Sequence, residues 1–226
     1  MKLKSHRSNF LLQLTSLFLL PFVVTAFERL LRFSFTSFFQ NNLSIFVYSL
    51  TCIGVLVYSL LSKRDFGWNF NSLNRKITAI LLVVLALSTL FFFSVLKFKG
   101  LYTSNWNLGW IVWLILVFRE EFILRGIIQT ETSELLTGKW LGLSKSIWFS
   151  SLVFSLWHLV NLGVYTPQVV LVQIVSVFLI AGPLYGWIKE RTNNVIISYL
   201  CHISGDLFFY ALYSLVFSKL LFPVWN

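Results

Sequence analysis

Three short groups of ionisable residues interrupt apolar stretches of the sequence, and they are the residues most able to do chemistry. They are Glu120 and Glu121 with Arg125, then His158, and then His202 with Asp206. A charged side chain at the centre of a bilayer costs about 2.5–3.5 kcal/mol on insertion scales, so ionisable residues inside a membrane usually serve a function. Carboxylates and histidines are also the usual general bases of enzymes. The sequence therefore predicts acid–base chemistry within the membrane.

The two adjacent glutamates are expected to have different surroundings. Helical geometry places Glu121 and Arg125 one turn apart on the same face, where carboxylate and guanidinium can pair. Glu120 points about 100° away around the helix axis. The pair would neutralise one carboxylate and leave Glu120 able to act as a general base in a low-dielectric cavity. The competing interpretation of the Glu121–Arg125 pair is an ion pair that only locks two helices together.

Each histidine shares a helix face with a second candidate residue. Phe154 precedes His158 by one turn, and His202 precedes Asp206 by one turn. Phe154 and Asn161, the latter three residues after His158, are candidates to line a cavity. Taken alone, His158 is better explained as a core histidine bonded to a backbone carbonyl. His202 and Asp206 are also compatible with a simple helix contact.

Helices must bring these groups together if they act as one site. A helix rises about 1.5 Å per residue, which places Glu120, His158 and His202 about 12–18 Å into their apolar segments. All three therefore fall near the middle of the membrane. We expect three helices to present them to one cavity.

Long apolar segments identify the chain as a polytopic membrane protein. Of its 226 residues, 57% are hydrophobic and only 12% are charged, which excludes an ordinary water-soluble domain. About 20 apolar residues cross a bilayer, and the apolar segments allow about seven crossings. They are 9–27, 43–62, 77–96, 108–129, 146–165, 169–188 and 194–217. With the apolar tail 220–225 as an interfacial or partial eighth element, we expect an all-α transmembrane bundle of about seven to eight helices with an intramembrane cavity.

The distribution of basic residues predicts a cytoplasmic N-terminus. Lys2, Lys4 and Arg7 precede the first apolar segment, and no clean cleavage site follows, so we expect a retained first helix. With this end inside, the inner loops carry more Lys and Arg than the outer loops. The net charge of +10 is explained by anionic lipid headgroups. No basic run is interleaved with aromatic residues, so we expect no nucleic-acid partner.

The chain is expected to form a single membrane-embedded unit without a soluble domain. Its longest polar connections are residues 62–76 and 130–145. Gly182, Pro183 and Gly186 predict local bending in the sixth segment. Cys52 and Cys201 lie in apolar segments without CxxC partners, so they are expected to be buried small hydrophobic residues.

The three polar groups resemble the motifs of a known family. Glu120-Glu121-x-x-x-Arg125, Phe154-x-x-x-His158 and His202-x-x-x-Asp206 look like the EExxxR, FxxxH and HxxxN/D motifs of the CPBP family, also called the Abi family, which groups CAAX prenyl proteases with bacteriocin-processing and self-immunity proteins. The resemblance covers about residues 108–210. It implies a CPBP-like catalytic helical core at 108–217, preceded by transmembrane helices of uncertain role at 1–107.

The resemblance implies an intramembrane endopeptidase in a bacterial plasma membrane. Its partners would be membrane lipid and a membrane-associated or prenylated peptide or protein, whose peptide bond it hydrolyses. By resemblance, Glu120 would activate the attacking water with His158 beside it. Glu121 and Arg125 would hold the geometry of the site.

His202 and Asp206 would, by the same resemblance, face the developing oxyanion. The prenyl proteases carry Asn at the last position of the motif, whereas this chain carries Asp206. A carboxylate cannot donate a hydrogen bond unless it is protonated. Asp206 is therefore also a candidate to orient or charge His202.

A metal site is the main alternative for these side chains. Glu120, His158 and His202 form a ligand set that zinc also uses. Their spacing does not match the HExxH pattern, and the resemblance favours a glutamate-dependent mechanism that needs no cofactor. Zinc at these three residues stays open as the second interpretation.

Two other functions are compatible with the sequence. The first is a bacteriocin self-immunity or scaffold protein that acts by binding without catalysis, and such a protein should tolerate Glu120→Gln. The second is a proton-coupled transporter that uses the glutamates and His158 as a relay. The chain lacks the matching broken helices in two halves that transporters usually show.

Overall fold

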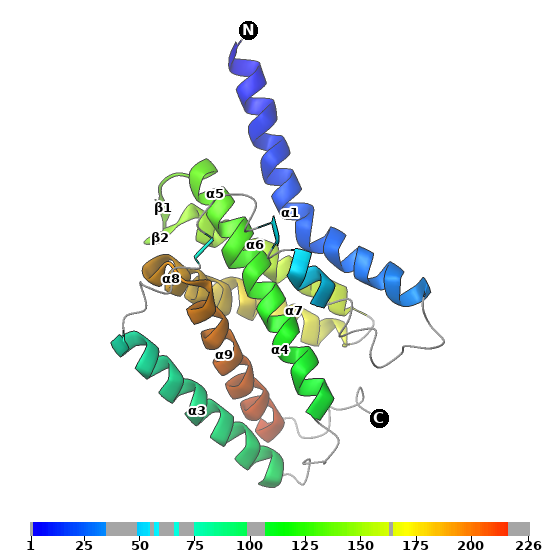
Figure 1. Cartoon of the computed structure of the whole chain (residues 1–226), viewed down its shortest axis with the longest axis vertical. Coiled ribbons are helices and arrows are strands. Elements are labelled where there is room, and N and C mark those ends of the chain that lie inside the picture. The colour runs from blue at the N-terminus through cyan, green and yellow to red at the C-terminus, as the bar shows by residue number, and fades with distance from the viewer. Residues whose placement is uncertain are drawn as a thin grey trace.

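Helices make up almost all of the chain that the computed structural model describes, namely residues 2–34, 49–54, 57–58, 66–67, 75–98, 107–162 and 165–216. The named α-helices are α1 (Lys2–Ser34), α3 (Arg75–Phe98), α4 (Asn107–Glu121), α5 (Gln129–Leu135), α6 (Lys145–Trp157), α7 (Pro167–Ser176), α8 (Gly182–Thr192) and α9 (Val195–Val216). The predicted all-α architecture is confirmed for these residues (Figure 1).

The helices follow the apolar segments of the sequence. Three of them are long and apolar enough to cross a membrane, at Phe10–Leu30, Pro167–Thr192 and Val195–Leu212, and Val83–Val95 is a shorter apolar stretch. Most of the expected segment 43–62 and the whole tail 220–225 lie outside the described residues.

Two of the apolar segments contain π-helical turns, which the assumption of regular α-helices did not anticipate. Phe122–Ile128 forms a π-helix (η3) that joins α4 to α5, and Val177–Ala181 forms a second one (η5) that joins α7 to α8. The second directly precedes Gly182 and Pro183, so the expected local irregularity is present there. π-helical turns are rare and often occur at functional sites. The first begins immediately after Glu121.

The bundle has two main packing regions. In the first, α3 runs along α9, and Phe92 and Val95 pack with Val117 of α4 and Leu207 of α9 (Figure 1). In the second, buried residues of η3 and α6 pack together, with α1 against them. The three sequence motifs are carried by elements of both regions, so side chains from α4, η3, α6 and α9 can meet where the regions adjoin.

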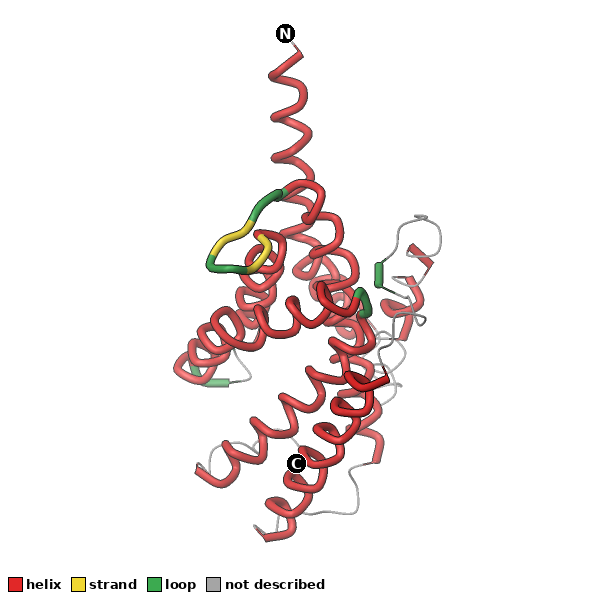
Figure 2. Tube along the Cα trace, turned by 90° about the vertical axis from the view of Figure 1, so that its left-hand side faces the viewer, coloured by secondary structure: helices red, strands yellow, loops and turns green. Residues whose placement is uncertain are grey.

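Helix α1 bends along its length and extends beyond the other helices at its N-terminal end (Figures 1 and 2). It contains Pro21, whose ring removes one backbone hydrogen bond and kinks a helix. The C-terminal half of α1 approaches α6 and η3. This half therefore lies close to the helices that carry the motifs.

The polar connection 130–145 is largely structured. It contains α5 and a short hairpin of β1 (Lys139–Trp140) and β2 (Leu143–Ser144), in which Lys139 pairs with Ser144 and Trp140 with Leu143. The turn places Leu141 at φ 49° and Gly142 at φ 81°, both in the left-handed region. The hairpin leads directly into α6, the helix that ends immediately before His158.

Candidate active site

The carboxylate of Glu121 joins three other side chains at the centre of the bundle. Its Oε1 accepts a hydrogen bond from His202 Nδ1 at 3.0 Å, and its Oε2 accepts one from the Ser198 hydroxyl. Arg125 Nε lies 3.8 Å from Oε2, so the expected i,i+4 pair is present. Glu121 and Arg125 are completely buried. The hydrogen bonds of Glu121 therefore connect α4 to α9 and supply the partners that a buried carboxylate needs.

Arg125 extends this network to α6. Its Nη1 donates a hydrogen bond to Ser150 Oγ at 2.8 Å, and its guanidinium carbon lies 5.7 Å from the centre of the Phe154 ring. The Phe154 ring in turn lies 5.0 Å from the His158 ring and 5.5 Å from the His202 ring. Phe154 therefore packs against both histidine rings.

His202 lies between two carboxylates. Its Nδ1 faces Glu121, and its Nε2 lies 3.5 Å from Asp206 Oδ1, one turn further along α9. Both partners accept hydrogen bonds, an arrangement that a doubly protonated imidazole ring satisfies. The expected contact between His202 and Asp206 is thus present, although 3.5 Å is long for a hydrogen bond.

Tyr185 of α8 completes the surroundings of His202. The two rings stack with their centres 4.8 Å apart and their planes 26° apart. The Tyr185 hydroxyl fills the space where a side chain at Gly205 would begin. Sequence reasoning missed Tyr185, because a tyrosine in an apolar span resembles an ordinary interfacial residue. Gly205 lies between the two residues of the His202–Asp206 motif. A glycine at this position could have indicated that another side chain packs closely against α9.

His158 begins a 3-10 turn (η4, His158–Asn161) at the end of α6. Its Nδ1 lies 2.9 Å from the backbone oxygen of Phe154. A carbonyl oxygen only accepts, so Nδ1 carries the hydrogen and the neutral ring presents Nε2 as an acceptor. The bond expected of a core histidine is therefore present, and it also fixes the tautomer that a proton acceptor needs.

Glu120 lies among the other ionisable groups of the cluster. The groups that act electrostatically on its carboxylate are His202, Arg119, His158 and Asp206. In contrast to Glu121, it is only partly buried, and it makes no hydrogen bond to another side chain that the structure describes. The structure thus places Glu120 where both histidines act on its carboxylate electrostatically, without a hydrogen bond from a described side chain.

Asn161 is the candidate that the structure does not bring into the cluster. Its Nδ2 donates a hydrogen bond to Gln173 Oε1 at 3.2 Å. The side chain therefore links η4 to α7. The geometry gives no support to Asn161 as a residue that lines the space around Glu120 and His202.

The residues proposed for zinc do not form a ligand set. Among the described residues, no group of three or more His, Cys, Asp or Glu side chains is arranged to hold a metal ion. Both ring nitrogens of His202 face carboxylates, and Nδ1 of His158 faces a backbone carbonyl. Of the four ring nitrogens of the two histidines, only Nε2 of His158 has no partner among the described residues. These side chains do not fit a tetrahedral zinc site as they stand.

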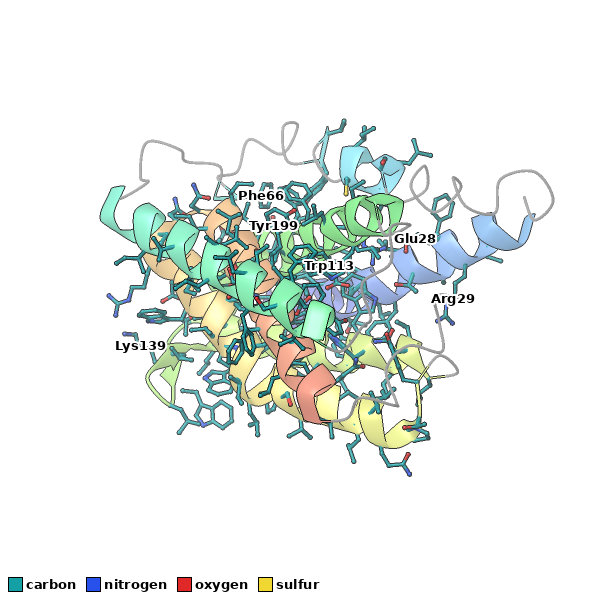
Figure 3. All side chains as sticks on the ribbon, turned by 90° about the horizontal axis from the view of Figure 1, so that it is seen from below. Glu28, Arg29, Phe66, Trp113, Lys139 and Tyr199 are labelled. Carbon is teal, nitrogen blue, oxygen red and sulfur yellow. The ribbon has the colours of Figure 1, made fainter. Side chains whose placement is uncertain are left out.

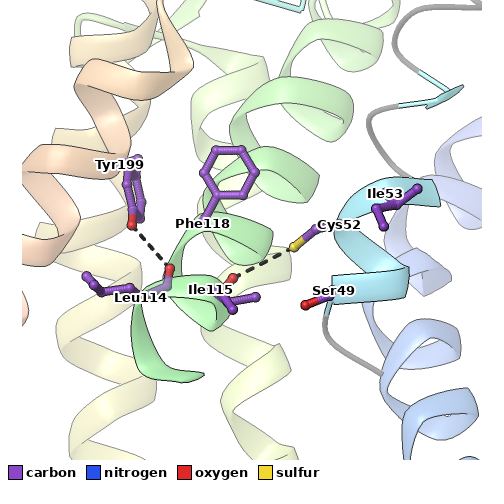
Figure 4. A pocket seen from close by; sticks show the side chains of 7 residues that line it. All are labelled: Ser49, Cys52, Ile53, Leu114, Ile115, Phe118 and Tyr199. Carbon is purple, nitrogen blue, oxygen red and sulfur yellow. Dashed lines mark hydrogen bonds between the residues drawn. The ribbon is translucent and has the colours of Figure 1, made fainter. Parts of the chain in front are cut away.

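A pocket of about 320 Å³ lies away from these residues, between the segment 49–54 and α4 (Figure 4). Its walls are apolar apart from a few polar atoms, and it is lined by Ser49, Cys52, Ile53, Leu114, Ile115, Phe118 and Tyr199. Cys52 and Cys201 are both free thiols. None of the motif residues lines this pocket, so it is separate from the polar cluster.

The segment that holds the cluster has recognisable relatives. Residues 102–208 match the family described as Rce1-like, type II CAAX prenyl endopeptidase. This segment is similar to the Rce1-like family. It contains all three motifs, and the predicted relation to the CPBP family is confirmed. The match and the long apolar helices together support an integral membrane protein.

The Rce1-like segment begins before α4 and ends within α9. Helices α1 and α3 therefore lie outside it. No curated protein and no solved structure matches the chain. The division of the chain at residue 107 and the roles of the individual site residues stay predictions.

Proposed function

We propose that this protein is an intramembrane endopeptidase in which Glu120 activates the water that attacks a peptide bond. The observation that carries the proposal is the position of Glu120. Its carboxylate lies within the electrostatic influence of two histidines and an aspartate, inside a segment similar to a family of CAAX endopeptidases. A carboxylate in such a place can take a proton from water and later return it to the leaving amine.

His158 supports this base. Its Nδ1–H group is held by the backbone oxygen of Phe154, which directs the lone pair of Nε2 away from that bond. An imidazole with one fixed N–H group can accept a hydrogen bond from the same water as Glu120. Two acceptors on one water orient its oxygen lone pair toward the carbonyl carbon of the substrate.

His202 is the proposed donor to the oxyanion. Its Nδ1–H group is engaged by Glu121 at 3.0 Å, whereas Nε2 is 3.5 Å from Asp206. The longer contact leaves Nε2–H available to an oxygen that develops negative charge in the transition state. Asp206 then orients and charges His202 and does not itself contact the oxyanion. This role suits a carboxylate in place of the family's asparagine.

The proposed substrate is a membrane-associated or prenylated peptide or protein. A family of prenyl endopeptidases and a site within a helical bundle both support this class. No prenyl group need contact the catalytic residues. It needs only to hold the scissile bond close to the membrane.

The test is cleavage of a panel of fluorogenic membrane-anchored peptides, including a farnesylated CAAX peptide. The purified wild type is compared with Glu120→Gln and with Glu134→Gln, a matched change at an exposed glutamate of α5. We expect turnover by wild type and Glu134→Gln, and loss of turnover by Glu120→Gln. Full activity of Glu120→Gln would overturn the proposal.

A chelator arm addresses the metal question separately. Persistent wild-type activity in chelator is expected of a glutamate-dependent peptidase, whereas loss of activity that added zinc restores would move Glu120 into a metal site. If wild type cleaves no peptide, an immunity assay with Glu120→Gln decides between catalysis and binding. Retained protection by this variant would favour the self-immunity or scaffold function.

A further inference from the structure

Helix α1 carries a buried carboxylate that the catalytic motifs do not include. Glu28 is only 4% exposed, and it forms an ion pair with Arg119 of α4, which is also buried. Thr51, in the segment 49–54, donates a second hydrogen bond to Glu28 Oε1 at 3.1 Å. Burying a carboxylate and a guanidinium requires compensation for lost hydration, so this contact has a specific geometry. Glu28 and its neighbour Arg29 lie on α1 in Figure 3.

The partners of α1 are direct neighbours of proposed catalytic residues. Arg119 immediately precedes Glu120, and its guanidinium carbon lies 5.2 Å from the centre of the Trp157 ring. Trp157 immediately precedes His158, and its Nε1 donates a hydrogen bond to Thr25 Oγ1 at 2.8 Å. Thr25 is one turn before Glu28 on α1. One face of α1 thus contacts the residue before each proposed proton acceptor.

A third contact extends the same face. Arg29 Nη2 donates a hydrogen bond to the backbone oxygen of Val160 at 2.6 Å, within the 3-10 turn that begins at His158. We call Thr25, Glu28 and Arg29, with their partners on α4, α6 and η4, the α1 clamp. The clamp joins α4 to the end of α6, two elements that carry the base and its histidine. Its α1 residues lie outside the segment 102–208 that matches the family, whereas their partners lie within it.

We propose that the α1 clamp positions Glu120 and His158 relative to each other, so that Thr25 and Glu28 are positioning residues of the active site. The proposal rests on the proposed function, because it needs Glu120 and His158 to act on one water. A displacement of about 1 Å between reacting groups can cost about 100-fold in rate. The clamp fixes the backbone next to both groups, and a loosened clamp should change turnover more than substrate binding.

The kinetic test compares Glu28→Gln and Thr25→Val with wild type in nanodiscs. Thr25→Val keeps the shape of the side chain and both buried charges, so it tests the clamp even if Glu28→Gln fails to fold. Ser16→Ala is the matched control on α1, because Ser16 bonds only to Leu12 of its own helix. We expect kcat to fall about 10- to 100-fold in the two clamp variants with KM nearly unchanged, and Glu28→Asp to recover part of the loss.

If Thr25→Val and Glu28→Gln fold, melt like wild type and keep the kcat of Ser16→Ala, the clamp has no positioning role. A fall in thermal stability with unchanged kcat in the folded fraction would assign it a structural role only.

A second readout does not depend on activity. The chain has only three histidines, so histidine-selective isotope labelling gives few NMR signals, and His158→Gln assigns one of them. We expect the His158 ring signal to shift in Thr25→Val and Glu28→Gln but not in Ser16→Ala, with the His6 signal unchanged in all. An unmoved His158 signal in folded variants would overturn the proposal.

The two readouts separate this proposal from the proposed function. If the wild type cleaves no peptide but the His158 signal shifts in the clamp variants, the proposed peptidase function is refuted. The contact between the clamp and His158 is then still supported. If the wild type is active and the clamp variants keep its kcat and its His158 signal, only the positioning role of the clamp is refuted.

Discussion

Glu120 and Glu121 are adjacent in the chain, yet they occupy two different kinds of environment. Glu121 is completely buried and accepts hydrogen bonds from His202 and Ser198 while it pairs with Arg125. Glu120 is partly exposed, and charged groups surround it without holding it in a hydrogen bond to a described side chain. A carboxylate whose acceptor sites are occupied can stabilise a fold but cannot readily take a proton. Glu121 therefore has the surroundings of a structural residue, whereas Glu120 has those expected of a reacting group.

The largest expected effect is a loss of activity on substitution of Glu120. Glu120→Gln should lower kcat by about 1,000-fold, because a general base contributes about 10²–10⁴-fold to a rate. The melting temperature should stay close to that of wild type, since the amide replaces a carboxylate that holds no described partner. Peptide cleavage and thermal unfolding in the same detergent measure both quantities. A variant that loses stability as well would remove the contrast between the two glutamates.

Glu121→Gln should instead destabilise the fold. Removal of one partner from a buried ion pair costs about 3–5 kcal/mol, because it leaves the other charge buried without compensation. Here that charge is the guanidinium of Arg125, which is completely buried. Unfolding by denaturant measures the loss. A double variant, Glu121→Gln with Arg125→Met, should recover part of the stability, and no recovery would show that the pair is not coupled.

Gly205→Ala tests the wall behind His202. A methyl group at this position would occupy the space of the Tyr185 hydroxyl, so the tyrosine ring must move away from the histidine. Overpacking of this kind costs about 1–3 kcal/mol. Gly54→Ala is the matched control, because an added methyl group there meets no atom within 4 Å. Equal thermal stability of the two variants would contradict the described packing.

An effect on stability similar in size to that of Gly205→Ala is expected at Ser150. Its hydroxyl accepts a hydrogen bond from Arg125 and donates one to the backbone oxygen of Ile147. Ser150→Ala leaves a buried guanidinium N–H group without this partner, at a cost of about 1–3 kcal/mol. The kcat and KM of the folded protein should change little, since Arg125 pairs with the buried Glu121 and not with Glu120. A selective loss of kcat without a loss of stability would place Arg125 with Glu120 instead.

Local spacing predicted those parts of the site that lie within one helix. The Glu121–Arg125 and His202–Asp206 contacts follow from residues four apart in the sequence, and both are present. The apolar segments also predicted where helices occur. The sequence alone did not distinguish α-helical from π-helical turns around Arg125, because both bury the same apolar residues.

Contacts between distant residues could not be predicted in this way. Glu28 and Arg119 are 91 positions apart, and no local spacing relates them. The hydrogen bond between Glu121 and His202 joins two motifs that were expected to meet, but the motif spacing did not show which glutamate the histidine would contact. Tertiary packing decided both pairings.

The close approach of α8 to α6 limits how this protein can be engineered. A side chain at Gly182 would begin 2.7 Å from Ser151, and one at Gly186 would begin 2.9 Å from Ile147. Replacing glycine with alanine inside a helix normally increases stability by about 0.5–1 kcal/mol. These positions are therefore obvious targets for stabilising the protein in detergent. Here the substitution would push two helices apart. Such a campaign should leave both glycines unchanged and begin at Gly54, which has open space around it.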